Sequence, residues 1–308
     1  MRLLVVGAGS TGGYFGGRLA EAAGDVTFLV RPARAAKLNE TGLRILSPFG
    51  DATLRPQVVT TGTLAETYDA VLLTVKAYQL EAAMEDLAPA IGPESMILPV
   101  LNGMRHMDLL TQRFGPHNVV GCALKVSTTL DDDGRIVQLS TLQDIAYGEL
   151  DGELTPRIAA LDAFMRSAKI GARLSPAIRR EMWEKWTLLA SLGAINCLMR
   201  GTIGEVETCA GGAGFALRLL SEVVAIVTAV GAQPSDGFLA VARTMLTEKG
   251  SPLASSMFRD LQSGRPIEAE AIVGDLVRRG ANAGVDAPLL CAAYVCLAVH
   301  QNKIGAVH

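Results

Sequence analysis

The sequence predicts an α/β protein in which a doubly wound parallel sheet is followed by an all-helical C-terminal domain. Two observations carry this prediction. Up to about residue 170, short apolar runs alternate with amphipathic segments, which is the rhythm of strands and helices in a parallel sheet. Beyond about residue 174 the alternation stops, and apolar residues recur at helical spacing only.

Four apolar runs predict the strands of the N-terminal sheet. They are LLVV (3–6), VTFLV (26–30), AVLLTV (70–75) and MILPVL (96–101). Runs this short and this apolar are typical of strands that are buried on both faces. The segment between the last two, YQLEAAMEDLAPAI, has the apolar spacing of a helix.

A hairpin is predicted further along the N-terminal half. Two strand-like segments, 119–129 and 135–140, flank the acidic turn DDDG, and 144–150 is expected to form another strand. Thr155 followed by Pro156 then predicts the start of a helix, because threonine caps helices and proline suits their first position.

The change from alternating to purely helical spacing predicts two domains. The boundary is expected near GARLSP, with one domain over 1–173 and a helical domain over 174–308. Helical spacing is clear in RREMWEKWTLLASL and in GFALRLLSEVVAIVTAV. The second of these could bury a subunit interface or an intrachain core, and of the two we favour a homodimer.

Composition narrows the classes of function. Hydrophobic residues make up 49% of the 308 residues and charged residues 19%, so the chain can bury a sizeable core. The formal net charge is −3 and no dense basic run occurs, which argues against a nucleic-acid partner. We expect no signal peptide and no membrane span. The five cysteines are widely spaced, which favours reduced thiols in a cytoplasmic protein without a metal site.

The segment GAGSTGGYFGGRLA follows the first apolar run directly. Gly7, Gly9 and Gly12 form G-x-G-x-x-G between a strand and a helix, which is typical of a Rossmann-type dinucleotide-binding domain. The first glycine allows the tight turn, the second admits the pyrophosphate and the third lets helix and strand pack closely. The alternative is a glycine-rich turn without a ligand. The expected coenzyme contacts are Gly7, Ala8, Gly9, Ser10, Thr11 and Gly12.

Two arginines after the second strand indicate which coenzyme is bound. An NAD site has an acidic residue at this strand end, whereas an NADP site has an arginine nearby. Arg31 and Arg34 occur here, and no acidic residue does. A guanidinium group matches a 2′-phosphate, so we expect NADP(H), with Arg31 as the better ligand and two solvated arginines as the alternative.

Polar residues follow two further strands. Lys76 ends one strand and Asn102 the next, and ligands of doubly wound sheets lie beyond the carboxyl ends of the strands. Each residue could instead make only local loop hydrogen bonds. Together they are candidates for contacts to coenzyme or substrate.

The helical half offers further candidates, each with an ordinary alternative. Lys185 lies between two tryptophans, and a partly desolvated lysine can donate a proton near neutral pH, although it could also be a solvated surface lysine. Ser255 and Ser256 can cap a helix or bind an oxyanion. Glu268 and Glu270 lie near a helix start, where carboxylates stabilise the helix dipole.

These motifs, in this order, resemble those of the ketopantoate reductase family. The shared elements are GAGSTGGYFGGRLA, VKAYQ, LNGM, WEKW and SSMFRDLQSGRPIE, with GVDAPLL in the helical tail. The resemblance implies NADPH-dependent reduction of a 2-oxo acid in a cleft between a Rossmann domain and a helical domain. It also implies that Lys185 is the catalytic lysine and that Asn102 touches coenzyme and substrate. By the same resemblance Lys76 contacts the coenzyme, Ser256 the substrate and Glu268 the nicotinamide ribose.

The sequence departs from that family at the substrate. The family carries asparagines four and eight residues after the lysine, where this chain has Leu189 and Gly193. Asn196 lies three residues further on and cannot simply replace Gly193, and RGTIGEV lacks another expected asparagine. The pocket is therefore expected to be less polar, and ketopantoate and pantothenate synthesis are doubtful.

Three functions remain open at this point. The first is a reductase that takes hydride from NADPH and a proton from Lys185, with Asn102 and Glu268 assisting. The second is a catalytically weak sensor of NADPH or a metabolite. The third is a reductase or dehydrogenase of a different, less polar 2-oxo acid, hydroxy acid or imine.

Overall fold

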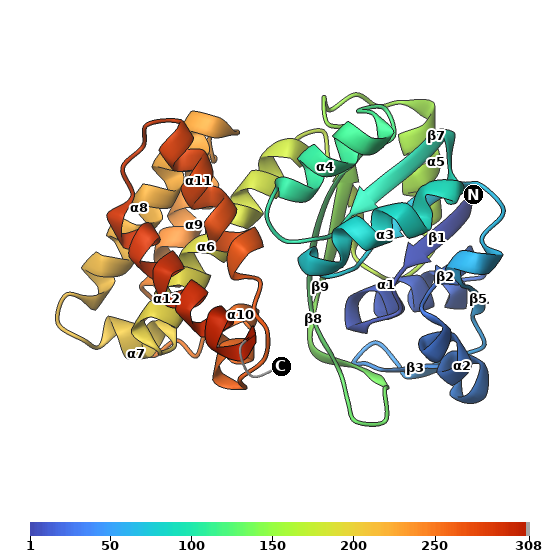
Figure 1. Cartoon of the computed structure of the whole chain (residues 1–308), viewed down its shortest axis with the longest axis horizontal. Helices are drawn as coiled ribbons and strands as arrows, with labels where there is room; N and C mark the ends of the chain where they lie inside the picture. The colour runs from blue at the N-terminus through green and yellow to red at the C-terminus, as the bar shows by residue number, and fades with distance from the viewer. Residues whose placement is uncertain (306–308) are drawn as a thin grey trace. The chain divides into compact units, whose positions relative to one another are not determined.

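The computed structural model describes residues 1–305, and they form two compact units. The first unit comprises Met1–Leu101 and His106–Ile178. The second comprises Asn102–Arg105 and the chain from Arg179 onward. Figure 1 shows the sheets in the first unit and only helices in the second. The predicted α/β class with a helical C-terminal part is confirmed.

A parallel sheet with strand order β5-β2-β1-β6-β7 forms the centre of the first unit. The strands are β1 (Arg2–Val6), β2 (Asp25–Leu29), β5 (Gln57–Val59), β6 (Tyr68–Leu73) and β7 (Ile91–Pro99). The four apolar runs of the sequence are β1, β2, β6 and β7. Their side chains are almost fully buried, which is why the runs lack polar alternation.

Helices and short 3-10 turns connect the strands of the first unit. They are α1 (Ser10–Glu21), α2 (Pro32–Thr41), α3 (Leu80–Leu87), α4 (Arg105–Phe114) and α5 (Pro156–Met165), with 3-10 turns η1 (Thr61–Thr63), η2 (Ala77–Gln79) and η3 (Ala88–Ala90). The predicted cap of α5 is present, because the Thr155 hydroxyl accepts a hydrogen bond of 3.3 Å from the Ile158 N–H. Pro156 takes the first helical position, as expected.

A second sheet packs in the same unit, with the order β10-β9-β3-β4 and β8 paired to β9. Its strands are β3 (Leu43–Leu46), β4 (Ala52–Leu54), β8 (Gly121–Leu130), β9 (Ile136–Gly148) and β10 (Ala172–Leu174). The predicted hairpin is the antiparallel pair of β8 and β9. The expectation of a separate strand at 144–150 is wrong, because that segment is the end of β9, which continues to Gly148 with one register shift opposite β8.

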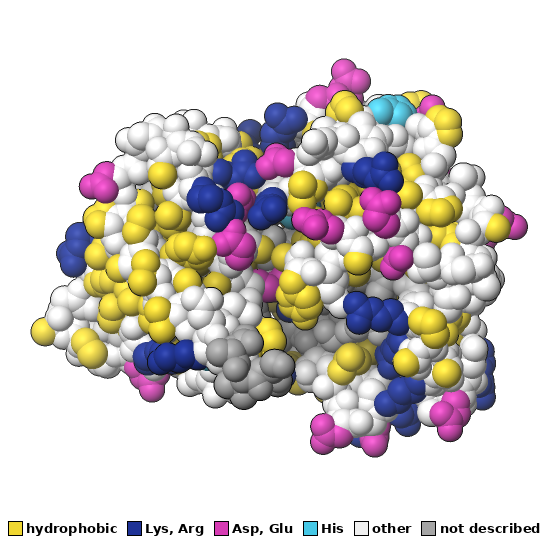
Figure 2. Space-filling view, viewed as in Figure 1, with side chains coloured by type: hydrophobic (Ala, Val, Ile, Leu, Met, Phe, Trp, Pro, Cys, Tyr) yellow, Lys and Arg dark blue, Asp and Glu magenta, His cyan; other side chains and the backbone are white. Residues whose placement is uncertain are grey.

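The second unit consists of helices. They are α6 (Ile178–Met199), α7 (Ile203–Glu207), α8 (Gly212–Val230), α9 (Asp236–Leu246), α10 (Ser256–Gln262), the π-helical turn η4 (Glu270–Gly274), α11 (Asp275–Asn282) and α12 (Pro288–Gly305). Figure 2 shows hydrophobic side chains gathered on the surface of this unit. Val295 and Val299 of α12 and Leu217 of α8 are among the exposed ones. A homodimer stays a prediction.

Helix α8 bears on the expectation of no membrane span. Among residues 1–305 it is the one helix long and apolar enough to cross a membrane by length and composition. However, α8 packs against α11 and α12, and its Glu222 carboxylate accepts hydrogen bonds from the Leu289 and Leu290 N–H groups at the start of α12. The same length and composition occur in core helices, so α8 is weak evidence for a span.

Candidate active site

In the glycine turn between β1 and α1, neighbouring atoms approach the backbone at Gly12 so closely that a side chain would not fit. Gly7 has a φ of +97°, which favours glycine, and its N–H donates to the Leu29 carbonyl at 3.0 Å. A Cβ on Gly12 would lie 2.1 Å from Thr74 Oγ1 and 2.3 Å from the Gly7 carbonyl. Thr74 Oγ1 itself donates to the carbonyls of Val6 at 2.8 Å and Gly7 at 3.0 Å. The turn is therefore fixed from the next strand along the sheet.

The start of α1 fits the diphosphate of a dinucleotide. Among the described residues, no side chain caps this helix at Gly9. A Cβ on Gly9 would meet no atom within 4 Å, so the surface in front of the first turn is open. Backbone N–H groups at a helix start attract phosphate through hydrogen bonds and the helix dipole.

The two arginines after β2 lie differently. Arg31 is the exposed N-cap residue of α2. Arg34 is half-buried, and its guanidinium donates from Nε at 3.2 Å and from Nη2 at 2.9 Å to the Ala8 carbonyl in the glycine turn. Burial lowers the pKa of Arg34, but an arginine stays charged at neutral pH. Arg34 thus brings positive charge directly to the turn. The sequence analysis had favoured Arg31 as the ligand of the 2′-phosphate and did not predict this contact.

Lys76 is the exposed residue that precedes η2, just after β6. Its backbone N–H donates to Gln79 Oε1 at 3.4 Å. It belongs to the same unit as the glycine turn and Thr74.

In the second unit, two predicted site residues meet although they are far apart in sequence. Asn102 Nδ2 donates to Glu268 Oε2 at 3.2 Å. Both side chains are half-buried, and so is Lys185 on α6. The Asn102–Arg105 segment belongs to the helical unit, although in sequence it follows β7 of the parallel sheet closely. Sequence spacing gives no sign of this pairing.

The serines after residue 254 have separate roles. Ser255 is buried and caps α10, because its hydroxyl accepts a hydrogen bond of 3.1 Å from the Phe258 N–H. Ser256, the first residue of α10, is exposed. Of the two, Ser256 therefore retains a hydroxyl at the surface of the helical unit.

The first two turns of α6 after Lys185 present an apolar face. Residues four, eight and eleven positions along a helix lie on roughly the same face, and here they are Leu189, Gly193 and Asn196. A Cβ on Gly193 would lie 2.6 Å from the Met257 methyl group, so a thioether fills the space beside it. Asn196 offers no substitute for a pocket amide, since its side chain is committed to other groups.

The hydrogen-bond partners of the Asn196 side chain are all backbone groups. Asn196 Nδ2 donates to the Gly201 carbonyl at 2.8 Å and to the Leu253 carbonyl at 3.4 Å. Its Oδ1 accepts from the Ser255 N–H at 2.9 Å. Asn196 is fully buried, so this amide joins the end of α6 to the segment that leads into α10.

Sequence reasoning also missed the contacts made by Trp186. Its indole N–H donates to the Ile272 carbonyl in η4 at 2.8 Å, and the Arg279 guanidinium lies 5.7 Å from its ring centre. From the two tryptophans beside Lys185, the sequence analysis inferred only that the lysine is partly desolvated. A π-helical turn has no local sequence pattern that would have revealed the contact.

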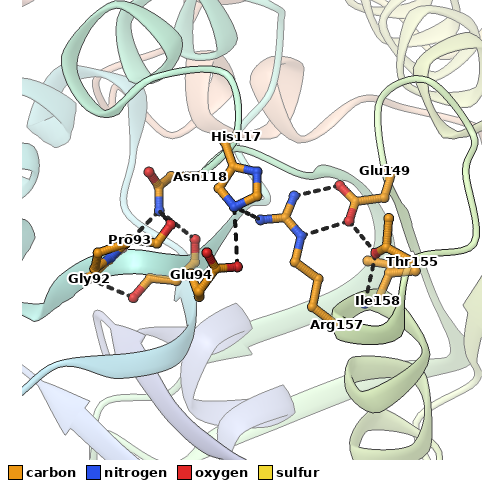
Figure 3. A network of polar contacts seen from close by, with 10 residues as sticks. Gly92, Pro93, Glu94, His117, Asn118, Glu149, Thr155, Arg157 and Ile158 are labelled. Carbon is orange, nitrogen blue, oxygen red and sulfur yellow. Dashed lines mark hydrogen bonds and ion pairs between the residues drawn. The ribbon is translucent and has the colours of Figure 1, made fainter.

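A further polar network in the first unit is structural (Figure 3). Arg157 makes two hydrogen bonds of 2.8 Å to the buried Glu149 carboxylate and approaches His117 Nε2 at 3.1 Å. Thr155 donates to Glu149 at 2.6 Å, which links the cap of α5 to the end of the hairpin. Burial acts to raise the pKa of Glu149, but the hydrogen bonds from Arg157 and Thr155 outweigh it and hold the pKa below its ordinary value.

Comparison with known proteins gives the same family along the chain. Residues 3–152 match the family described as ketopantoate reductase PanE/ApbA, and residues 177–301 match its C-terminal part. An uncharacterized oxidoreductase of Bacillus subtilis, YkpB, is 33% identical over 98% of this chain and 100% of its own length. A 2-dehydropantoate 2-reductase of Mesorhizobium japonicum is 27% identical over 91% of both chains.

Solved structures agree with the fold. A PanE/ApbA family ketopantoate reductase from Ralstonia eutropha superposes with a TM-score of 0.88 at 23% identity and covers 99% of this chain and 100% of its own. A D-mandelate dehydrogenase solved with NADH and anilino(oxo)acetate reaches 0.85 at 19% identity and covers 99% of both chains. At such identities these two likenesses show the fold alone.

Proposed function

The chain belongs to the ketopantoate reductase family and is an NADP-dependent oxidoreductase, and from this premise we propose that it reduces a 2-oxo acid to a 2-hydroxy acid with Lys185 as the proton donor. The observation that carries the proposal is the hydrogen bond between Asn102 and Glu268 in the unit that also holds Lys185. This bond joins two candidate residues 166 positions apart in the sequence.

The coenzyme would be held chiefly by backbone. The bare start of α1 at Gly9 would take the diphosphate, and Arg34 with Arg31 would take the 2′-phosphate. The remaining contacts proposed for the coenzyme are Gly7, Ala8, Ser10, Thr11, Gly12, Lys76, Asn102 and Glu268. When bound, the coenzyme supplies the hydride that the reduction consumes.

Lys185 would act on the carbonyl oxygen of the substrate. Its ammonium group would stabilise the negative charge that develops there and donate the proton that completes the alcohol. Water would then return a proton to the neutral amine. Asn102, held by Glu268, would orient the carbonyl group through its amide. Ser256 would contact the substrate carboxylate with its exposed hydroxyl.

The substrate side chain is proposed to be apolar and to lack a hydroxyl group. Leu189 and Gly193 follow Lys185 on α6, Met257 fills the space beside Gly193, and Asn196 is consumed by backbone groups. A hydroxyl group placed against such a surface would lose its hydrogen bonds to water without replacement.

Replacing Lys185 by Met tests the chemistry. We expect turnover with NADPH and a branched 2-oxo acid to fall by about a hundredfold or more, while the Kd for NADPH changes less than about twofold. Stopped-flow oxidation of NADPH and a fluorescence titration measure the two quantities. The matched control is Lys249→Met, which removes an exposed lysine of the same unit and should leave turnover unchanged. Near-normal turnover in Lys185→Met would refute the proposal.

A sensor is the second candidate, and the loss of the two pocket asparagines at Leu189 and Gly193 favours it. It requires tight NADPH binding without oxidation by any member of a panel of 2-oxo acids. Oxidation by one of them in wild-type protein at more than a few turnovers per active site would exclude it.

A further inference from the structure

The π-helical turn η4 lies between Glu268 and helix α11. The N–H of Asp275 donates to the Glu270 carbonyl, which closes the wider ring of a π-helix. Such turns contain one more residue than an α-helical turn and are frequent at functional sites. Two residues inside this turn, Ala271 and Ile272, make contacts that lead to candidate catalytic residues.

The first contact leads to Lys185. Trp186, its neighbour on α6, is 1% exposed, and its indole N–H donates to the Ile272 carbonyl at 2.8 Å. A buried indole ring with a satisfied N–H has little freedom to turn. The rotation of α6 about its own axis at Lys185 is therefore fixed against η4.

The second contact leads to Asn102. The next residue, Gly103, has a φ of +82°, and a Cβ placed on it would lie 2.2 Å from the Ala271 carbonyl. Only glycine permits this approach of the two backbones. Asn102 is thus held by η4 through its backbone neighbour and by Glu268 through its side chain.

The turn is itself anchored from its other side. The Tyr294 hydroxyl on α12 donates to Glu270 Oε2 at 2.7 Å, and Arg278 on α11 forms an ion pair with the same carboxylate. A Cβ on Gly274 would lie 2.6 Å from the Tyr294 ring, so the ring packs flush against the turn. Three helices and the Asn102–Arg105 segment thus meet at five residues.

We propose that η4 is the platform that positions Lys185, Asn102 and Glu268 as one set, and that Trp186 is the positioning residue for Lys185. The proposal rests on the proposed function, because it assumes that Lys185 donates the proton. Small errors in the position of a catalytic group reduce the rate of the chemical step far more than they reduce binding.

Trp186→Phe removes the indole N–H and keeps an aromatic ring. We expect kcat to fall about tenfold, with the Kd for NADPH and the KM for the 2-oxo acid within about twofold of wild type. Trp183→Phe is the matched control, since the Trp183 ring packs beside that of Trp186, with ring centres 5.3 Å apart, and its replacement leaves the bond from Trp186 to Ile272 in place. It should retain kcat within about twofold. Thermal unfolding of each variant reports any loss of the fold separately.

A double-mutant cycle with Lys185→Met separates positioning from general packing. If Trp186 acts through Lys185, Trp186→Phe should lower the residual turnover of Lys185→Met by less than about twofold. A further tenfold loss in that background would overturn the proposal. So would a wild-type kcat in Trp186→Phe, or an equal loss in Trp183→Phe. If Lys185→Met itself kept full turnover, the proposed function would fail and this proposal with it.

Gly103→Ala tests the contact between η4 and the Asn102–Arg105 segment. This variant is the second test of the proposal if Trp186→Phe does not fold. The added methyl group must displace Ala271 or the Asn102 segment. We expect kcat to fall about tenfold or more while NADPH still binds to within about threefold. Wild-type kcat in a folded Gly103→Ala variant would contradict the proposal, because the clash would then have no catalytic consequence.

Discussion

The glycine turn and the face of α6 that carries Lys185 are proposed to recognise their ligands in opposite ways. At the glycine turn the atoms proposed to face the coenzyme belong to the backbone, and Gly9 and Gly12 leave room there because they lack side chains. On α6 the proposed chemistry depends on side chains, and the positions four and eight residues after Lys185 hold Leu189 and Gly193. The glycine turn depends on the absence of side chains, whereas the face of α6 depends on which side chains are present.

This difference teaches how the two parts of such an enzyme can diverge. A backbone site tolerates almost no substitution, because any Cβ meets the ligand or the neighbouring strand. A site made of side chains can change its ligand specificity through two substitutions that leave the helix intact. The coenzyme apparatus is therefore readable from a short motif, whereas the substrate is not.

The largest effect is expected at Asn196, which tests whether this amide is structural. Asn196→Ala would strip the partners from three backbone groups and lower the free energy of unfolding by about 3 kcal/mol. Urea denaturation measures this. Below the unfolding transition, kcat should stay within about twofold of wild type. A large loss of kcat without destabilisation would instead make Asn196 a substrate ligand.

At the glycine turn, Gly9→Ala sharpens the comparison. A methyl group there meets no protein atom within 4 Å, so the free energy of unfolding should not fall. It would, however, stand where the diphosphate approaches, and the Kd for NADPH should rise about thirtyfold. Gly237→Ala, where a methyl group also meets nothing within 4 Å, is the control and should bind NADPH normally. Unchanged affinity in Gly9→Ala would place the coenzyme elsewhere.

Arg34→Gln asks whether side chains contribute at the coenzyme end. The Kd for NADPH should rise about tenfold while the Kd for NADH changes less than about twofold, because only NADPH carries the 2′-phosphate. Arg55→Gln, an exposed arginine that donates to the Asn39 carbonyl, should alter neither value. Equal weakening of both coenzymes would assign Arg34 to the turn rather than to the phosphate.

The smallest effect concerns the network around Glu149, which lies in neither region. Because its pKa is held below the ordinary value of 4.5, its carboxylate stabilises the fold above that pH, and the stabilisation is lost as pH falls through the lower folded value. Arg157→Met should reduce this pH dependence by about 1 kcal/mol, measured by urea denaturation between pH 7 and pH 3. Arg113→Met, in an exposed pair with Glu85, should leave it unchanged.

The sequence predicted whatever depends on local pattern. The apolar runs became β1, β2, β6 and β7, and Thr155 caps α5 as expected. Partners brought together only by the tertiary fold were not foreseeable. The contact of Arg34 with Ala8 and that of Trp186 with Ile272 are of this kind.

Two other surprises have the same origin. Strand β9 runs on from 144 to Gly148 because β8 stays paired along it, which no local turn signal could reveal. The family resemblance suggested the roles proposed for Asn102 and Glu268, but the bond between them joins distant segments and became visible only in the structure.

The most direct test compares two substrates that differ by one hydroxyl group. Ketopantoate and 3,3-dimethyl-2-oxobutanoate share the carbonyl, the carboxylate and the branched carbon, and only ketopantoate carries the hydroxyl. With NADPH in excess, the apolar face of α6 predicts that kcat/KM for the hydroxyl-free acid is at least about tenfold higher. A preference for ketopantoate by about a hundredfold would contradict an apolar pocket, and no oxidation of NADPH by either acid would count against this class of substrate.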